Sequence, residues 1–280
     1  MLTRRWRLSL VVALVGTAAI AGLARAVLVS PLAIFVDARA RTTEVTLANP
    51  SPAPEEVTIE VRYGFPSTDS LTELPITPTW AADSVSASAP SAARFLRVFP
   101  RRVVLQPGQT QVVRIFASPP PGLPDGEYWA RFMATSKQLP DTATRAGDQV
   151  GITFAIVTSI PVWYRKGPVR TSVRLDTLVA SAEHDTLKAR LVVAREGNAS
   201  WLGTTVFTLA DGRGRTVREW PIMTAIFPAR YRRRYRWALD GVPPGSYTLT
   251  ARFRAVRDDM KQSDLLPAAD VQASTIVLVP

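Results

Sequence analysis

The sequence predicts an all-β protein made of two immunoglobulin-like β-sandwich domains that follow an N-terminal signal peptide. Three observations carry this prediction. Short runs rich in Val, Ile, Thr and Tyr recur along the chain, turn residues separate them, and no run after residue 30 keeps a helical period. About seven such runs fall in each of two blocks, which is the strand number typical of an immunoglobulin-like sandwich.

The first 26 residues have the order of a secretory signal peptide. Three arginines precede the uncharged, largely apolar run 8–23, and small residues stand at Ala24 and Ala26, where signal peptidase reads. We therefore expect export, with residues 1–26 removed. The alternative is an uncleaved membrane anchor, because the apolar run is only slightly shorter than the roughly 18–20 residues that span a bilayer.

Composition excludes much enzyme chemistry. The chain has no Cys and a single His, so thiolate catalysis, Cys-ligated zinc, iron–sulfur clusters and multi-histidine metal sites are closed to it. No stretch combines a nucleophile, a base and an orienting group. We therefore expect a protein that is not an enzyme and that has no catalytic residue, cofactor or metal site.

The first block, residues 27–167, is expected to form one sandwich. Its runs alternate apolar and polar residues, as half-buried strands do. The predicted strands are 43–47, 56–63, 95–99, 103–105, 111–117, 127–134 and 151–164. Between them, residues 64–93 form a long segment rich in Ser, Thr, Pro and Ala, in which we expect a short strand near 74–80 and disorder after it.

The second block, residues 168–280, follows the polar break Arg165-Lys166-Gly167-Pro168 and repeats the same pattern. Its predicted strands are 173–178, 187–193, 205–209, 217–220, 231–239, 247–253 and 271–279. We expect these residues to form a second, independent sandwich.

One stretch of the first block carries a family resemblance. Residues 99–115 read FPRRVVLQPGQTQVVRI and residues 122–129 read GLPDGEYW. This is a strand, a Pro-Gly turn, a strand with one charge among aliphatics, and a proline loop before an aromatic strand. In order and spacing it resembles the first domain of periplasmic pilus-assembly chaperones of the PapD type. The segments 47–49 (LAN) and 161–165 (PVWYR) agree, so the resemblance covers residues 31–167.

The resemblance implies a function and a site. In that family the last strand of the first domain completes the sandwich of an unfinished pilin subunit. Here residues 151–159 would be that strand, with Ile152, Phe154 and Ile156 on one face as the donated side chains. The alternative is that these three side chains face the core of their own domain. The implied partners are pilin-like subunits with an incomplete sandwich, and participation of an outer-membrane usher is left open.

The resemblance also implies an interdomain ion-pair cluster, which would comprise Glu127, Arg165 and Asp240. The chain departs from the family where two basic residues grip the client's C-terminal carboxylate. Those positions fall on Leu32 or Ala33 and on Pro161, none of which is basic. A neutral pair cannot make charge-assisted hydrogen bonds to a carboxylate, so a client must be anchored in another way.

The basic excess gathers most densely in the second block. The chain carries 34 Lys+Arg against 23 Asp+Glu. As a strand, residues 230–237 place four arginines on one face: Arg230, Arg232, Arg234 and Arg236. These arginines would either bind an anionic membrane or partner surface or simply face solvent on an exposed strand. Export removes nucleic acid as a routine partner, and we expect attachment to a membrane only through an uncleaved signal segment.

The sequence therefore predicts a periplasmic, non-enzymatic chaperone-like protein that caps pilus or fimbrial subunits by lending a strand. The alternative is a structural or adhesive β-sandwich protein of the cell envelope that shares the fold.

Overall fold

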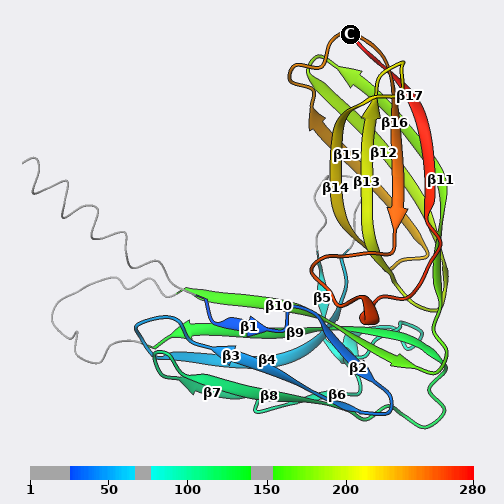
Figure 1. Cartoon of the computed structure of the whole chain (residues 1–280). Helices are drawn as coiled ribbons and strands as arrows, with labels where there is room; N and C mark the ends of the chain where they lie inside the picture. The colour runs from blue at the N-terminus through cyan, green and yellow to red at the C-terminus, as the bar shows by residue number, and fades with distance from the viewer. Residues whose placement is uncertain (1–25, 67–76, 140–153) are drawn as a thin grey trace, which may run out of the picture.

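The computed structural model describes residues 26–66, 77–139 and 154–280, so residues 1–25 of the expected signal peptide lie outside the described part. Among the described residues, regular structure is β-strand apart from two 3₁₀ turns, Ala82–Ser84 and Gln262–Asp264. None of them belongs to a helix with the length and apolarity needed to cross a membrane. The strands form two sandwiches that meet end to end like the arms of an L (Figure 1), which confirms the predicted all-β, two-sandwich fold.

The first sandwich consists of two sheets. One has the order β1-β3-β8-β6, formed by Leu28–Ser30, Thr42–Ala48, Thr110–Ala117 and Leu96–Phe99. The other has the order β2-β10-β9-β4-β5, formed by Ile34–Asp37, Ala155–Lys166, Gly126–Gln138, Glu55–Gly64 and Thr79–Trp80. In addition, β7 (Arg102–Leu105) pairs with β4. The short strands β1 and β2 were not predicted, because three or four residues are too few to show an alternation.

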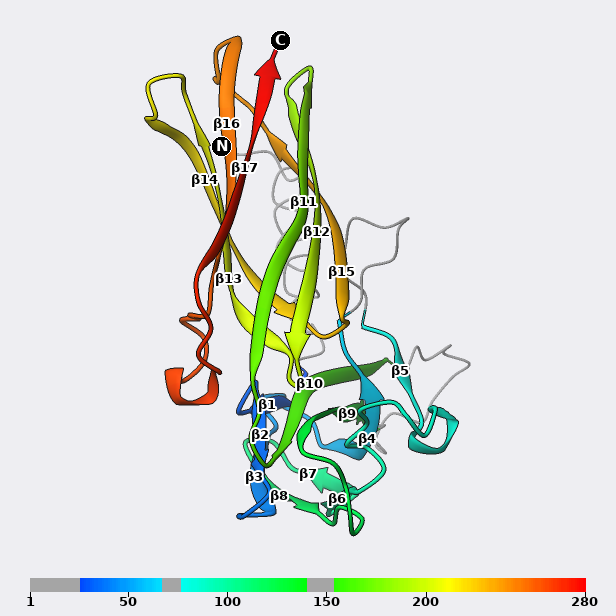
Figure 2. The same ribbon diagram turned by 90° about the vertical axis from the view of Figure 1, so that its right-hand side faces the viewer.

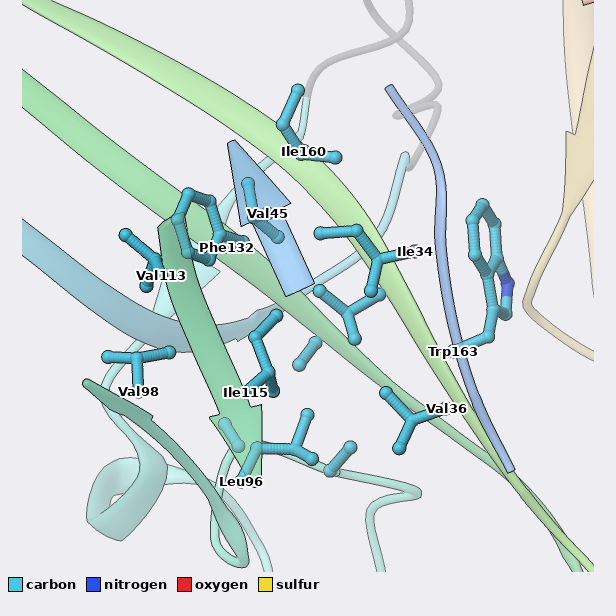
Figure 3. Packing of buried hydrophobic residues seen from close by; sticks show 14 of the residues in the cluster. Ile34, Val36, Val45, Leu96, Val98, Val113, Ile115, Phe132, Ile160 and Trp163 are labelled. Atoms are coloured by element: carbon cyan, nitrogen blue, oxygen red, sulfur yellow. The ribbon is translucent and has the colours of Figure 1, made fainter. Parts of the chain in front are cut away.

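Inward-facing side chains of both sheets fill the first core, as the alternation of the strands requires. Figure 3 shows aliphatic residues from different strands converging on Phe132, which is fully buried in β9. Trp163, two residues before Arg165 on β10, lies apart from that aliphatic group. The side chain of Trp163 is nevertheless buried, since it faces the second sandwich, as described below.

The expectation of disorder after residue 80 is wrong. Residues 81–95 fold into turns around Arg94, whose guanidinium donates hydrogen bonds to the carbonyl oxygens of Ala82 (3.4 Å), Ala87 (3.1 Å) and Ser86 (2.6 Å), and to that of Val85. The backbone at residues 91–93 is buried beside β9. Arg94 thus adds side-chain hydrogen bonds to those that the segment makes within itself, such as the bond from Ser84 Oγ to the carbonyl oxygen of Ala81 (3.0 Å). The part of the expected strand at 74–76 lies outside the described residues.

The second sandwich also has two sheets, seen as separate layers in Figure 2. One has the order β11-β12-β15, formed by Thr171–Glu183, Thr186–Gly197 and Arg230–Ala238. The other has the order β14-β13-β16-β17, formed by Thr216–Ile226, Trp201–Ala210, Gly245–Arg254 and Val271–Val279. Between the layers lie fully buried side chains such as Phe207, Leu191 and Leu249. Several of these strands are longer than predicted. In β13 and β14 the added residues, 201–204 and 221–226, are mostly apolar and therefore show no alternation of apolar and polar positions.

Candidate functional site: an open strand edge beside a fixed domain junction

Strand β10 is unpaired along half of one edge. On one side it pairs with β9 over its whole length, from Ala155 opposite Lys137 to Lys166 opposite Gly126. On the other side it pairs with β2, in parallel, only from Val162 to Arg165. Within the described residues, positions 155–161 therefore present backbone N–H and C=O groups that no strand satisfies on that side. In Figure 1 this edge lies on the inner side of the L.

The side chains of β10 change from exposed to buried along the strand. Phe154, just before it, is 66% exposed, and Ile156 is half-buried, whereas Ile160 on the same face is 4% exposed. The core of the first sandwich thus ends near Ile156. The alternation of apolar residues continues from Ile156 back to Phe154, whose side chain the core no longer covers. The third predicted donor residue, Ile152, lies outside the described residues.

Ala33 and Pro161, two of the neutral positions where a client carboxylate would be bound in the resembling family, lie side by side. Val162 pairs with Ile34, which makes Pro161 and Ala33 neighbours one step earlier in the same parallel register. Leu32 is 74% exposed. The nearby Lys166 is occupied, because its ammonium group donates to the carbonyl oxygen of Leu123 and lies 3.4 Å from Asp125 Oδ1. Of these described positions, Leu32, Ala33 and Pro161 carry no charge, and Lys166 is already engaged by Leu123 and Asp125.

A different cation lies next to Pro161. Arg131 on β9 is the direct partner of Pro161 on one side and of Arg62 on the other. It is 8% exposed, and its Nε atom has no hydrogen-bond partner within the described part of the chain. Burial lowers the pKa of Arg131, because desolvation penalises the charged form. Sequence reasoning missed this residue, since a single arginine in a strand gives no signal of burial.

The domain junction is built around the carboxylate of Glu127, the first side chain of β9 after Gly126. Its Oε2 atom accepts a hydrogen bond from Arg165 Nε at 2.8 Å, and the Glu127 side chain is fully buried. Its Oε1 atom accepts bonds from Trp129 Nε1 (2.8 Å) and from the backbone N–H and the hydroxyl of Ser200 (2.9 and 2.5 Å). Ser200 belongs to the second sandwich, so one carboxylate joins both domains.

Arg165 makes a second link across the junction. Its Nη1 atom donates a hydrogen bond to the carbonyl oxygen of Asp264 at 2.7 Å, and its guanidinium lies 4.8 Å from the ring centre of Phe35. The chain then turns at Gly167, whose φ of 63° and closeness to Asp125 leave no room for a side chain. The connection between the sandwiches is thereby held at three successive residues: Arg165 and Lys166 by their hydrogen bonds, and Gly167 by its turn.

Asp240 does not belong to this cluster, so its predicted role is wrong. It follows the end of β15, where Ala238 pairs with Thr186, at the hairpin end of β11 and β12. Ser200 lies at the opposite end of the second sandwich, beside the pair Thr171 and Gly197. Asp240 is exposed, and its backbone carbonyl accepts a bond from Arg218. The second domain contributes a hydroxyl, a backbone N–H and a backbone carbonyl instead, and side-chain charge alone cannot reveal such partners.

Aromatic rings reinforce the junction. Phe227 of the second sandwich lies 5.0 Å from Trp129 and 6.2 Å from Trp163, centre to centre, and both tryptophans are on the outer face of the first sandwich. Trp163 in turn stacks on Phe35 at 4.7 Å and donates its Nε1–H to Ser200 Oγ at 3.2 Å. Phe227 is itself buried. The apolar contact explains why Trp163 points away from the first core.

The four predicted arginines of β15 share one exposed face. Arg230, Arg232, Arg234 and Arg236 are exposed, whereas Tyr231 and Tyr235 between them are buried. Arg233 also points inward, with its guanidinium 4.8 Å from the ring centre of Tyr235. Among the described strands, β15 pairs with β12 alone and so stands at the edge of its sheet.

Comparisons with known proteins find similarity only in solved structures. No protein-family model matches the chain, and no curated protein matches it. The YadV chaperone is 12% identical with a TM-score of 0.49, over 89% of this chain and 99% of that chain. The class 5 fimbriae chaperone CfaA is 12% identical with a TM-score of 0.44, over 91% and 99%.

A third similar structure is a complex. The pre-assembly complex of the chaperone CsuC with the tip adhesion subunit CsuE, from Csu pili of Acinetobacter baumannii, matches with 12% identity and a TM-score of 0.43. The match covers 90% of this chain and 98% of that chain.

Proposed function

We propose that this protein is an exported, non-enzymatic chaperone that binds pilin-like subunits and completes their sandwich with residues 154–159 of its first domain. The observation that carries the proposal is the open edge of β10 beside exposed Phe154 and half-buried Ile156. An added strand gains affinity from backbone hydrogen bonds and specificity from alternate side chains in pockets. Residues 154–159 offer both: backbone groups that are unpaired on one side, and apolar side chains at alternate positions.

An unpaired and apolar strand edge is unusual in a folded protein. Unpaired strand edges template aggregation, and most proteins protect them with charges, prolines or covering loops. Here Pro161 has no backbone N–H to donate, but residues 154–160 carry no charge. The first of them, Phe154, is an exposed phenylalanine. A client strand laid along this edge would satisfy its backbone groups and cover its apolar side chains.

The junction gives this edge a fixed surrounding. Glu127, Arg165 and Ser200 are held by mutual hydrogen bonds, and Phe227 packs between the sandwiches. A client in the angle of the L would therefore meet two surfaces at a set orientation. We assign to the ion pair this positioning role rather than a large net gain in stability, because buried pairs roughly offset their own desolvation cost.

One observation favours a second candidate function, that of a structural or adhesive envelope protein. Strand β17 is the last strand of its sheet and lies beside β11 of the other sheet, and its outward side chains Ile276 and Leu278 are 74% and 71% exposed. Association through β17 would join copies of the chain without involving β10. The two proposals thus make different strands essential.

Paired substitutions test the first proposal. Phe154→Asp/Ile156→Asp places two charges where a client core would close, so we expect at least a tenfold loss of subunit recovered with the exported, affinity-tagged chain. Ile276→Asp/Leu278→Asp is the matched control on the other edge and leaves recovery unchanged. Circular dichroism of each variant checks that both sandwiches remain folded. Undiminished recovery with the β10 variant, or loss only with the β17 variant, would refute strand lending by residues 154–159.

A further inference from the structure

The outer face of the first sandwich carries a buried arginine beside the domain junction. Along β9, Arg131 alternates with Ala130 and Phe132, which face the first core, so its side chain lies on the opposite face of the sheet. Trp129, two residues earlier on that same face, contacts Phe227 of the second sandwich. Arg131 is therefore next to the surface on which the two sandwiches meet.

The neighbouring strand β4 makes room for this side chain. Gly64 on β4 has no side chain, and a Cβ atom there would lie 3.3 Å from Arg131 Cγ and 2.6 Å from the carbonyl oxygen of Pro78. The stem of Arg131 thus fills space that a larger residue at position 64 would need. As a result Arg131 is 8% exposed, and arginine is almost never buried so fully unless it is paired.

Within the described part of the chain, nothing compensates the charge of Arg131. Its Nε atom makes no hydrogen bond there, and burial alone shifts its pKa, which it lowers. The described acids on outward-facing positions of this sheet have other partners: Glu60 pairs with Arg62, Glu56 with Arg102, Glu127 with Arg165, and Asp37 with the backbone N–H of Arg39. Arg131 is therefore a buried cation without a counter-ion among the described residues.

Two further donors without partners stand next to Arg131. Arg62 is directly opposite it on β4, and Ser159 is diagonal to it on β10, where Arg131 pairs with Pro161 and Met133 pairs with Ser159. The Nε atom of Arg62 and the hydroxyl of Ser159 are buried and make no hydrogen bond with any described residue. In a sheet, Cβ atoms of directly opposite residues lie about 4.5–5.5 Å apart, and diagonal neighbours lie about 7–8 Å apart. One small ligand can therefore reach all three side chains.

The charge of this cluster indicates the class of ligand. Arg131 and Arg62 carry one positive charge each, and Glu60 contributes one negative charge through its ion pair with Arg62 at 3.2 Å. The remaining single positive charge matches a carboxylate group, which a guanidinium binds through two parallel N–H···O bonds. A phosphate group would bring about two negative charges and three acceptor oxygens, more than this cluster balances.

We propose that Arg131, Arg62 and Ser159 form a binding site for one carboxylate group. Without a ligand, two arginines directly opposite each other repel, and one of them stays buried without compensation, so both features cost stability. A bound carboxylate would remove both costs and would accept hydrogen bonds from the unpartnered donors. Local features that oppose the stability of the fold are typical of functional sites.

Two sources can supply the carboxylate: a small free acid, or an acidic group of a polypeptide bound along β10. Pro161, directly opposite Arg131, is the last residue of the unpaired edge of β10. A strand laid along residues 155–161 would therefore end close to Arg131. Only the second source rests on the proposed function, whereas the site itself does not.

Thermal unfolding of the exported chain tests the site, with sodium acetate as the probe and sodium chloride at equal ionic strength as the reference. Acetate at about ten times its dissociation constant should raise the melting temperature of the wild type by about 3–6 °C relative to chloride. Arg131→Met should abolish this rise. Arg213→Met removes an exposed arginine from the hairpin between β13 and β14 and should leave the rise intact.

An acetate effect of equal size in the wild type and in Arg131→Met would overturn the proposal. The absence of any effect up to about 0.3 M acetate would do so too, and so would a stronger effect of phosphate at equal ionic strength.

Recovery of a co-exported pilin-type subunit identifies the source of the carboxylate. A loss of about tenfold or more with Arg131→Met, the size expected for a charge-assisted hydrogen bond, assigns the carboxylate to the subunit. Unchanged recovery assigns it to a free acid. Failure of strand lending would appear separately, as undiminished recovery with Phe154→Asp/Ile156→Asp, and would leave the acetate result standing.

Discussion

Glu127 joins the two sandwiches through both oxygens of its carboxylate. It is fully buried, and it accepts hydrogen bonds from Arg165, Trp129 and Ser200. Removing one member of a buried, hydrogen-bonded ion pair costs more than the pair contributes, because the other charge remains buried without compensation. The stability of the junction should therefore depend on Glu127 far more than on any exposed ion pair, such as Arg114–Glu44.

Glu127→Gln is expected to lower the free energy of unfolding by about 3 kcal/mol, because the amide has one acceptor oxygen where the carboxylate has two. Its N–H₂ group must therefore face donors, either Arg165 or Trp129 and Ser200, and the charge of Arg165 loses its buried partner. Urea unfolding followed by tryptophan fluorescence measures the change. Asp240→Asn serves as the control, because Asp240 lies exposed at the far end of the second sandwich. A larger loss for Asp240→Asn than for Glu127→Gln would contradict the described junction.

Arg131 represents the opposite case, a buried cation whose Nε atom finds no hydrogen-bond partner in the part of the chain that the structure describes. We expect Arg131→Met to raise the free energy of unfolding by about 1–2 kcal/mol, because it removes a desolvated charge while keeping the apolar stem that packs near Gly64. Arg131→Lys keeps the charge and should give no such gain. Chemical unfolding of the two variants provides the comparison, and equal stability changes would show that the charge of Arg131 is compensated.

At the scale of elements, the sequence predicts strands well wherever one face of the strand is buried and the other is exposed to solvent. Residues 56–63 alternate strictly, and β4 occupies them. Prediction fails where the pattern is too short, as in β2, or where partners lie in backbone atoms, as at Asp264 and Ser200. The inner edge of β10 could be proposed only through the family resemblance, because alternation shows which face a side chain takes but not which edge of a strand is paired.

The hairpin between β13 and β14 gives an element-scale prediction. Backbone N–H groups of Arg215 and Arg213 donate to Asp211 Oδ1, and they hold the pKa of that carboxyl below its ordinary value. A carboxyl with a lowered folded-state pKa stabilises the fold above about pH 4 and loses that effect as pH falls through its folded pKa. Wild type should therefore melt at a higher temperature than Asp211→Asn at pH 7, and the difference should vanish near pH 2. A difference that stays constant with pH would contradict the assignment.

At the scale of the whole molecule, the shape depends on how firmly the sandwiches are joined. Phe227 contacts Trp129, Trp163 and Phe65 across the junction, all within 6.2 Å of its ring centre. The contact is continuous with the first core, while the second sandwich keeps a separate core of its own. The L shape should accordingly persist in solution and should loosen only when the junction itself is altered.

Phe227→Ala should increase the radius of gyration in small-angle X-ray scattering, because the domains lose their shared aromatic contact. Phe207→Ala is the matched control, since Phe207 is fully buried inside the second sandwich. Both changes remove a buried phenylalanine and should cost about 3–5 kcal/mol, but only the first should alter the scattering profile of the folded protein. Identical profiles for the two variants would show that the junction does not depend on Phe227.

The most direct test of the central claim is photo-crosslinking from the lent strand. A photoreactive phenylalanine analogue is placed at Phe154 in one version of the chain and at Ile276 in another, and each is exported together with a pilin-type subunit that lacks its final strand. The account predicts a covalent adduct with the subunit from position 154 and none from position 276. A subunit that binds but forms its adduct only from position 276, or from neither position, would contradict strand lending by β10.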